Sequence, residues 1–409
     1  MATLTGKLRE QKVDRGKQWM QENAQKMGPL EATTLEDYTF LKHVIGNKRI
    51  VWLGENGHGV KEHTILKTKI IQYLQQELNF KVVVFQNGLM ECASSEFVKE
   101  NLDTKRMIQQ TLAPFWQSEE MCPLFESIQS GDLSIAGMDC KISTEPNLFV
   151  TYMKALDVGF SKKALEKIEL LIKQIHRMSH KYLLKPNQKK ATEYTKHTYE
   201  KEKQEVQAWI GFIQKELQNC TQQFNQKKLE QHKIIIEKVL DNLYFLLEII
   251  PLKKSLYIKK RDEMMARNFE WICEKLYPNE KIIVWVHNMH MLKSGSPLSM
   301  YKPAGALISH KLKEDSYYMG LFMGEGQVAN HAGEVYSVRE CKEGSLEAFF
   351  MSMDAENIFV DFTKEEKKQW FNRSCIFYDL GVMISAMVPK KQFDGIFFTK
   401  KVHPPMRWK

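Results

Sequence analysis

Short apolar runs alternate with amphipathic stretches along much of this chain. The apolar runs have the length and the β-branched content of buried strands. They lie near residues 50–53, 81–86, 133–137, 281–286, 317–323 and 393–398. Helical spacing of apolar positions is found near residues 62–78, 261–276 and 303–313. This alternation predicts an α/β fold with a central mixed or parallel sheet flanked by helices.

The middle of the chain has a different pattern. From residue 151 to 250, apolar positions such as Leu165, Ile168 and Leu171 recur at helical spacing between interleaved charges. This is typical of long amphipathic helices packed as a hairpin or small bundle. We therefore expect a long all-helical insertion that forms a second lobe. The predicted parts are the N-terminal half of an α/β hydrolase-like core with a leading helix, the insertion, and the C-terminal half of the core, at residues 1–150, 151–255 and 256–409.

A polar turn follows the first predicted strand. The apolar run 50–53 ends in Gly54-Glu55-Asn56-Gly57-His58-Gly59, and a helical pattern begins directly afterwards. Open α/β sheets build their sites at the carboxyl ends of strands. A carboxylate beside an imidazole fixes its tautomer and raises its basicity, so Glu55 and His58 are candidate catalytic residues. The simpler alternative is an ordinary turn whose glutamate caps the helix.

Two further predicted strands also end in polar residues. The run 281–286 is followed by His287-Asn288-Met289-His290, and the run 81–86 ends in Gln86. If the chain turns after residue 286, His287 and His290 can flank one cleft. Hydrogen-bonded histidines at a strand end are the simpler alternative. Because the three polar clusters fall at strand carboxyl ends, we expect a cleft there.

Composition narrows the class of protein. The chain has 409 residues, 43% of them hydrophobic and 27% charged, as in ordinary globular proteins. The net charge of +9 comes from lysines that are mixed with glutamates, so we expect a solvated surface and no nucleic-acid partner. Residues 1–26 are polar and no apolar run is long enough to span a bilayer, which predicts no signal peptide and no membrane partner. Seven dispersed cysteines indicate reduced thiols and a cytoplasmic location.

Five segments occur in an order along the chain that is typical of one family. They are the stretch from Gly54 to Phe80, Gly137-Met138-Asp139, the helix pattern from Arg261 to Trp271, Val286-His287-Asn288-Met289-His290, and Phe393-Asp394-Gly395-Ile396-Phe397-Phe398. In these segments the chain resembles the erythromycin esterase family. Together they span residues 50–398, so the resemblance covers nearly the whole chain.

The resemblance implies a hydrolase that opens macrolide lactones with an activated water, without a metal, a cofactor or a covalent intermediate. By position, His58 is similar to the general base, Glu55 orients it, and His287 and His290 contact the reacting ester or the water. A neutral imidazole with a pKa of roughly 6.5 can accept the proton of water at physiological pH. Four residues at other motif positions are candidates for substrate binding: Glu62, Lys67, Asp139 and Arg261. For Arg261 a structural ion pair is the alternative.

Two positions depart from the family pattern. Gln86 stands where the family usually has a glutamate that assists the base, and its amide lacks the charge that would stabilise an imidazolium. Lys67 stands where arginine is usual and offers a point charge in place of a bidentate fork. The leading hypothesis is a hydrolase whose partner is a small-molecule ester or lactone. The alternatives are a metal-dependent hydrolase that uses the same Glu/His cluster, or a catalytically weak binding homologue because of Gln86.

Overall fold

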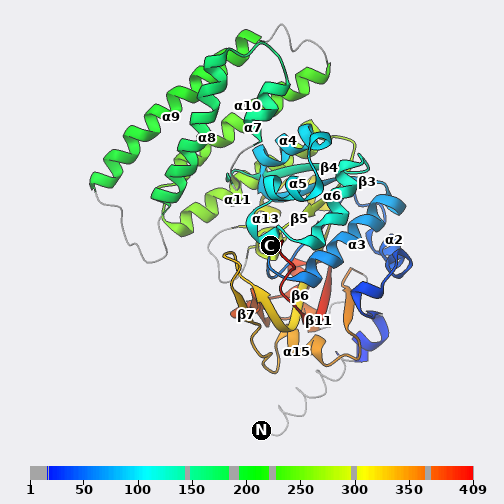
Figure 1. Cartoon of the computed structure of the whole chain (residues 1–409). Helices are drawn as coiled ribbons and strands as arrows, with labels where there is room; N and C mark the ends of the chain where they lie inside the picture. The colour runs from blue at the N-terminus through cyan, green and yellow to red at the C-terminus, as the bar shows by residue number, and fades with distance from the viewer. Residues whose placement is uncertain are drawn as a thin grey trace. The chain divides into compact units, whose positions relative to one another are not determined.

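A mixed sheet flanked by helices organises the chain (Figure 1). The computed structural model describes residues 16, 18–142, 148–183, 193–220, 227–295, 302–363 and 370–408. Within these residues the main sheet has nine strands in the order β1-β8-β11-β6-β2-β5-β3-β4, and β7 pairs with β6. The strands are β1 Gln25–Met27, β2 Ile50–Leu53, β3 Phe80–Gly88, β4 Ser134–Asp139, β5 Lys281–Trp285, β6 Ser316–Ala329, β7 Val335–Ser337, β8 Asn357–Asp361 and β11 Gly395–Val402. A separate two-stranded sheet pairs β9 Cys375–Asp379 with β10 Met383–Met387.

The centre of the sheet is parallel, and the edge formed by β8 and β1 is antiparallel. Strand β2 pairs in parallel with both β5 and β6, and β11 pairs in parallel with β6. All four residues of β2 are apolar and buried. A parallel strand in the centre of a sheet is covered on both faces, so side chains on both faces are apolar. Strands β8 and β1 extend the sheet with antiparallel pairs. The predicted fold class, a mixed sheet flanked by helices with a helical region, is confirmed.

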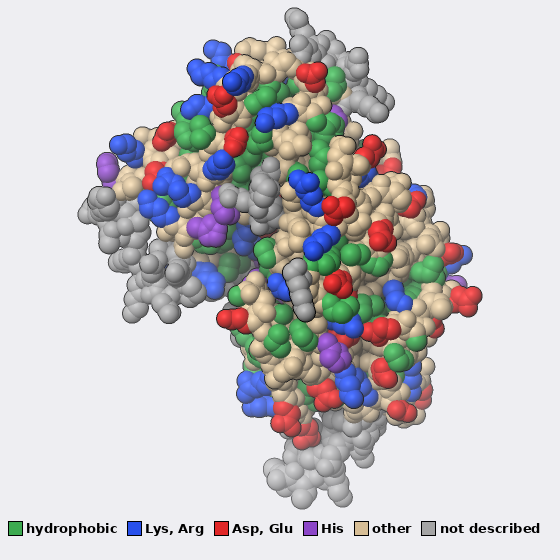
Figure 2. Space-filling view, in the orientation of Figure 1, with side chains coloured by type: hydrophobic (Ala, Val, Ile, Leu, Met, Phe, Trp, Pro, Cys, Tyr) green, Lys and Arg blue, Asp and Glu red, His purple; other side chains and the backbone are tan. Residues whose placement is uncertain are grey.

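Helices alternate with these strands along the chain. Their bounds are α2 Phe40–Ile45, α3 Lys61–Leu78, α4 Leu89–Val98, α5 Thr104–Thr111, α6 Cys122–Gln129, α7 Phe149–Ala155, α8 Lys162–Tyr182, α9 Glu193–Asn219, α10 Lys227–Ile249, α11 Lys254–Trp271, α12 Asn288–Met291, α13 Ala304–Leu307, α14 His310–Glu314, α15 Leu346–Met351 and α16 Pro389–Gln392. In the described part of the chain, none of the helices is both long and apolar enough to cross a membrane. On the face shown in Figure 2, basic and acidic side chains are intermixed.

The chain divides into two compact units. The first contains Met1–Val84, Pro114–Ser134 and Asn279–Lys409, and the second contains Phe85–Ala113 and Ile135–Pro278. The first holds the parallel centre of the sheet. The second holds the long helices α8, α9 and α10, whose inward residues form a hydrophobic core that includes Ile168, Ile210 and Leu240. These units cut the chain at other points than residues 150 and 255, so those two boundaries stay a prediction.

Some predicted elements differ from the observed ones in detail. The single helix expected over 303–313 is two short helices, α13 and α14, because Ser309 interrupts it and caps α14 through a hydrogen bond from the Leu312 N–H. The helix expected over 261–276 begins earlier, at Lys254, and its last turn, Ile272–Leu276, is a π-helix. Strands β1, β7, β8, β9 and β10 were not expected from the sequence.

Candidate active site

The turn after β2 is tied to the neighbouring strands. The Gly54 N–H donates to the Met319 carbonyl of β6 at 2.8 Å, and the Asn288 N–H donates to the Glu55 carbonyl at 2.8 Å. A Cβ at position 54 would lie only 1.9 Å from the Asn288 Oδ1, so this position requires glycine. A backbone hydrogen bond therefore joins the polar turn after β2 to the polar segment after β5, although the two lie far apart in the sequence.

Glu55 lies at the centre of the hydrogen bonds in the candidate site. Its carboxylate is buried and contacts three donors that come from three separate segments. The Oε1 atom lies 2.6 Å from His58 Nδ1 and 2.8 Å from the indole Nε1 of Trp116, and the Oε2 atom lies 2.6 Å from Lys67 Nζ. Burial opposes ionisation of Glu55, but the Lys67 ammonium and His58 outweigh it and lower the pKa of the carboxyl to about 2. Glu55 is thus ionised at neutral pH.

Lys67 supplies the charge that keeps Glu55 ionised. It lies on α3, its side chain is fully buried, and its ammonium lies 4.4 Å from the centroid of the Trp285 ring. Burial lowers the pKa of Lys67 to about 8, against the opposing effect of Glu55. The ammonium is therefore charged at neutral pH, and its contacts are with Glu55 and an aromatic face.

His58 is held in one tautomer and one orientation. Because Glu55 is ionised, it accepts a hydrogen bond from the Nδ1–H of His58, which leaves Nε2 as a proton acceptor. The ring is stacked on Phe115, with centroids 4.5 Å apart, and meets the edge of Trp116 at 5.3 Å. Burial lowers the pKa of His58, against the opposing effect of Glu55, so the imidazole is neutral at neutral pH.

Three more imidazoles lie around His58. The rings of His287 and His331 are each centred 4.9 Å from that of His58, and the ring of His290 is centred 6.4 Å from that of His287. His287 precedes α12, and its Nδ1 accepts a hydrogen bond from the Met289 N–H at 3.2 Å. Burial lowers the pKa of His287 well below its ordinary value. Neutral His287 therefore carries its proton on Nε2. The structure thus brings the candidate residues Glu55, His58, His287 and His290 together, and their roles in catalysis stay predictions.

The second unit contains three other residues that the sequence singled out. Gln86 lies on β3 and is buried. Asp139, the last residue of β4, accepts hydrogen bonds from the Arg261 Nε at 2.8 and 3.0 Å, and both side chains are buried. Arg261 opposes the effect of burial and lowers the pKa of Asp139. The ion pair connects α11 to β4. The roles of these residues in catalysis or substrate binding stay predictions.

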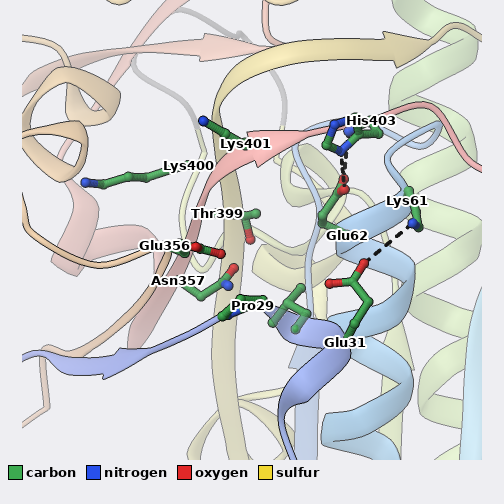
Figure 3. A pocket seen from close by; sticks show the side chains of 11 residues that line it. Pro29, Glu31, Lys61, Glu62, Glu356, Asn357, Thr399, Lys400, Lys401 and His403 are labelled. Carbon is green, nitrogen blue, oxygen red and sulfur yellow. Dashed lines mark hydrogen bonds and ion pairs between the residues drawn. The ribbon is translucent and has the colours of Figure 1, made fainter.

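Glu62 lines a cavity of about 380 Å³ (Figure 3). Its carboxylate accepts hydrogen bonds from the His403 N–H at 2.8 Å and from His403 Nδ1 at 2.7 Å. The cavity is also lined by Glu31, Lys61 and Thr399. Glu55 and His58 are absent from this lining, although Glu62 follows them closely along the chain. A role for Glu62 in substrate binding stays a prediction.

Four residues of the site were not predicted. Trp116 and Phe115 hold Glu55 and His58, His331 lies beside His58, and Asp379 has its Oδ1 3.6 Å from His287 Nε2. His331 follows the end of β6 at Ala329, so the same rule of a polar residue after a strand identifies it once β6 is recognised. The two aromatic residues carry no comparable signal, because aromatic side chains usually serve in packing.

Comparison with known proteins identifies the family. A family model described as erythromycin esterase matches residues 76–402. The putative hydrolase YbfO of Bacillus subtilis (strain 168) is 28% identical over 94% of this chain and 91% of its own length. Erythromycin esterase type II of Escherichia coli is 21% identical over 90% of this chain and 92% of its own length. A crystal structure of a Bacillus cereus protein has the same fold, with a TM-score of 0.76 at 21% identity over 97% of this chain and 99% of that one. The chain therefore belongs to the erythromycin esterase family, a family of hydrolases.

Proposed function

We propose that the protein hydrolyses a carboxylic ester or lactone by direct attack of water, with His58 as the general base. One observation carries this proposal: the 2.6 Å contact between Glu55 and His58 Nδ1, in a cluster where Lys67 keeps Glu55 ionised. The contact leaves His58 Nε2 as a proton acceptor, and the carboxylate stabilises the imidazolium that forms. This is the arrangement that a base needs to activate water.

The reaction proceeds in two steps. The water oxygen forms a bond to the carbonyl carbon, one water proton passes to His58 Nε2, and the carbonyl π electrons move to its oxygen. The oxyanion then re-forms the carbonyl, the bond to the alkoxy oxygen breaks, and His58 returns the proton to that oxygen. The oxyanion requires a hydrogen-bond donor, and His290 and His331 are further imidazoles in the cluster. The products are an acid and an alcohol, which remain in one molecule when the substrate is a lactone.

The name of one relative supports a choice of first substrates. The Escherichia coli relative is named as an erythromycin esterase, so macrolide lactones are the first substrates to test. A large apolar lactone also suits a site that uses one histidine and one water, because no charge on the substrate is required for the chemistry.

A metal-dependent route with the same residues fits poorly. Both oxygens of Glu55 already bind donors, and one of them is the Lys67 ammonium at 2.6 Å, which would repel a divalent cation. Among the described residues, no group of three or more His, Cys, Asp or Glu side chains is arranged to hold a metal ion. We therefore expect a chelator to leave the rate of hydrolysis unchanged. Loss of activity that added zinc restores would refute the metal-free mechanism.

The test is mass spectrometry of the protein incubated with erythromycin and a panel of macrolides and simple lactones. We expect a product heavier by one water, and no product with His58→Gln. The matched control is His310→Gln, because His310 has a side chain that is 86% exposed and lies 3.4 Å from Glu314 of its own helix. If the wild type converts none of these substrates and Gln86→Glu converts one of them, the protein is a catalytically silent homologue and the proposal fails.

A further inference from the structure

The segment that follows β11 contacts three parts of the chain around His58. Residues 403–407 form no helix or strand, and they include Pro404-Pro405. Backbone groups in such a segment have to find partners elsewhere in the chain. The 403–407 segment contacts the first turn of α3, the short 3-10 helix η5 Glu119–Met121, and the turn after β6. The first of these begins shortly after His58 in the sequence, and the other two carry or adjoin rings that contact it.

The first contact is with the start of α3. The His403 N–H donates to Glu62 Oε2 at 2.8 Å, and the His403 Nδ1–H donates to Oε1 at 2.7 Å (Figure 3). In the opposite direction, the Lys61 N–H donates to the His403 carbonyl at 2.9 Å. Glu62 is buried, so these bonds satisfy a carboxylate that is largely shielded from water. The segment is thus attached to the helix that follows the turn of the proposed base.

The second contact is with η5. The Met406 N–H donates to both oxygens of Glu120, at 3.0 and 3.3 Å, and the Glu119 N–H donates to the Met406 carbonyl at 2.9 Å. Glu120 is buried, and a hydrogen bond to a carboxylate is stronger than one between neutral groups. Only two residues separate η5 from Phe115 and Trp116, whose rings contact the proposed base.

The third contact is with the turn after β6. A Cβ at Gly333 would lie 3.2 Å from the Nη1 of Arg407, so the guanidinium packs against this glycine. Gly333 has a φ of 84°, which favours glycine. The same turn carries His331. The His331 ring is centred 4.9 Å from the ring of His58 and 4.8 Å from that of Phe115.

One short segment therefore joins three parts of the wall around His58. The rings in this wall do not lie on the sheet: Phe115 and Trp116 belong to one 3-10 turn, and His331 follows the end of β6. Strand register fixes the turn that carries His58, but it does not fix these rings. The 403–407 segment supplies that connection, because it binds the chain beside each of them.

We propose that Glu120 is a positioning residue, which holds the rings around His58 in place by binding the Met406 N–H. This inference rests on the proposed function, in which His58 is the general base. The rings keep the imidazole in one orientation and limit its contact with water. A displacement of about 1 Å in a catalytic group can cost about a hundredfold in rate, so a bond outside the site can control the chemistry.

The first test breaks this bond from the side of Met406, whose own side chain is 51% exposed. Met406→Pro removes the N–H donor, and Met406→Ala, the matched control, keeps it. NMR spectra of the ligand-free protein, labelled with ¹³C at histidine and assigned with His58→Gln, report His58 through the ring current of the Phe115 ring stacked on it. Met406→Pro is expected to shift the His58 Hε1 signal, and Met406→Ala is not. An unchanged signal in Met406→Pro overturns the proposal. No substrate is needed, so this outcome is separate from failure of the proposed function.

The same spectra give the pKa of His58. Burial lowers this pKa, so in Met406→Pro, where the ring gains contact with water, it is expected to rise towards the ordinary 6.5. The charged and titratable groups that face His58 are the same in all of these proteins: Glu55, Lys67, His287, His290 and His331. A change in the pKa therefore reports the rings and not a lost charge.

The second test is kinetic and uses an ester or lactone that the wild type hydrolyses. Glu120→Ala and Met406→Pro are expected to lower kcat by about tenfold with little change in KM, because the base moves and the substrate contacts do not. The acid limb of kcat/KM should move to higher pH in both. Glu120→Gln, whose amide oxygen still accepts the Met406 N–H, is expected to keep most of the wild-type kcat.

Controls separate positioning from a general loss of structure. Glu126→Ala, at an exposed position of α6, is expected to keep the wild-type kcat and melting temperature. If Glu120→Ala is unfolded at the assay temperature, Met406→Pro decides the question, because it leaves the buried side chain in place. An unchanged kcat and acid limb in folded Met406→Pro, or an equal loss in Met406→Ala, would show that Glu120 does not position His58.

Discussion

At the scale of single residues, Lys67 determines whether Glu55 can act as a carboxylate. The structure places the Lys67 ammonium on Glu55, whereas its place in the family pattern had indicated the substrate. If Lys67 is replaced by a neutral residue, the buried Glu55 carboxylate loses the positive charge beside it, so the pKa of Glu55 rises. The hydrogen bond between Glu55 and His58 is then no longer strengthened by the negative charge of the carboxylate. We therefore propose that Lys67 influences catalysis through Glu55 and His58.

Lys67→Met is expected to lower the free energy of unfolding by about 3–5 kcal/mol, because removal of one partner of a buried ion pair leaves the charge of the other partner buried and unpaired. Urea denaturation measures this. Lys162→Met is the matched control, because Lys162 has a side chain that is 92% exposed and should change the stability by less than about 0.5 kcal/mol. A loss below about 1 kcal/mol in Lys67→Met would show that Glu55 does not depend on this charge.

The pH profile of kcat/KM should have two limbs. His58 acts as a base only when neutral, and because burial lowers its pKa, activity is lost as pH falls through a value below the ordinary 6.5. Lys67 must be charged, and with its pKa lowered to about 8 its charge is lost as pH rises through that value. Lys67→Arg, whose guanidinium stays charged throughout this pH range, should abolish the alkaline limb and leave the acid limb in place. An alkaline limb that persists in Lys67→Arg belongs to another group.

The candidate residues that the sequence singled out around His58 share one property: each lies in a polar segment that follows an apolar strand. Glu55, His58, His287 and His290 have that local signal in the sequence. Trp116 and Asp379 reach the site through long-range folding, and their own neighbourhoods in the sequence do not distinguish them from packing or turn residues. The tautomer of His287 depends on the Met289 N–H, which only the three-dimensional structure reveals.

At the scale of elements, the β2 turn depends on glycine at position 54. Gly54→Ala would place its Cβ 1.9 Å from Asn288 Oδ1 and 2.7 Å from Met291 Sδ, so the turn or α12 has to move. We expect a loss of about 1–3 kcal/mol in stability and a large loss of kcat, because both histidine segments shift. Gly211→Ala is the matched control: it lies within α9, a Cβ there meets nothing within 4 Å, and alanine should be neutral or stabilising by about 1 kcal/mol. Equal activity in the two variants would show that the turn tolerates displacement.

The elements that were predicted well are those with a clear apolar run or a clear helical spacing of apolar residues in the sequence. Strand β2 was expected over 50–53 and is Ile50–Leu53, and helix α3 was expected over 62–78 and is Lys61–Leu78. The β9–β10 hairpin was missed because it is short and partly exposed, with Ile376 and Ile384 facing solvent. Its apolar residues do not alternate with the period of a half-buried strand, so the sequence lacks the usual signal.

At the scale of the whole molecule, composition and pattern identified a helical region but not which other segments join it. The helices of 151–250 were expected because their apolar positions have helical spacing. The second unit also includes 85–113 and 135–150, which have the same strand-and-helix pattern as the first unit. Which unit such a segment joins depends on its packing partners, and a linear pattern does not contain that information.

The buried ion pair between Asp139 and Arg261 allows the independence of the two units to be tested. Asp139→Asn leaves the Arg261 guanidinium buried without its counter-charge, and we expect a loss of about 3–5 kcal/mol. Because the helices of the second unit have their own hydrophobic core, hydrogen exchange should accelerate in α11 and α8 while β2 and α3 keep their protection. Asp241→Asn, at an exposed position of α10, is the control and should change neither. If exchange accelerates equally in β2 and α11, the two units unfold as one, and the ion pair stabilises the candidate site as well as the helices.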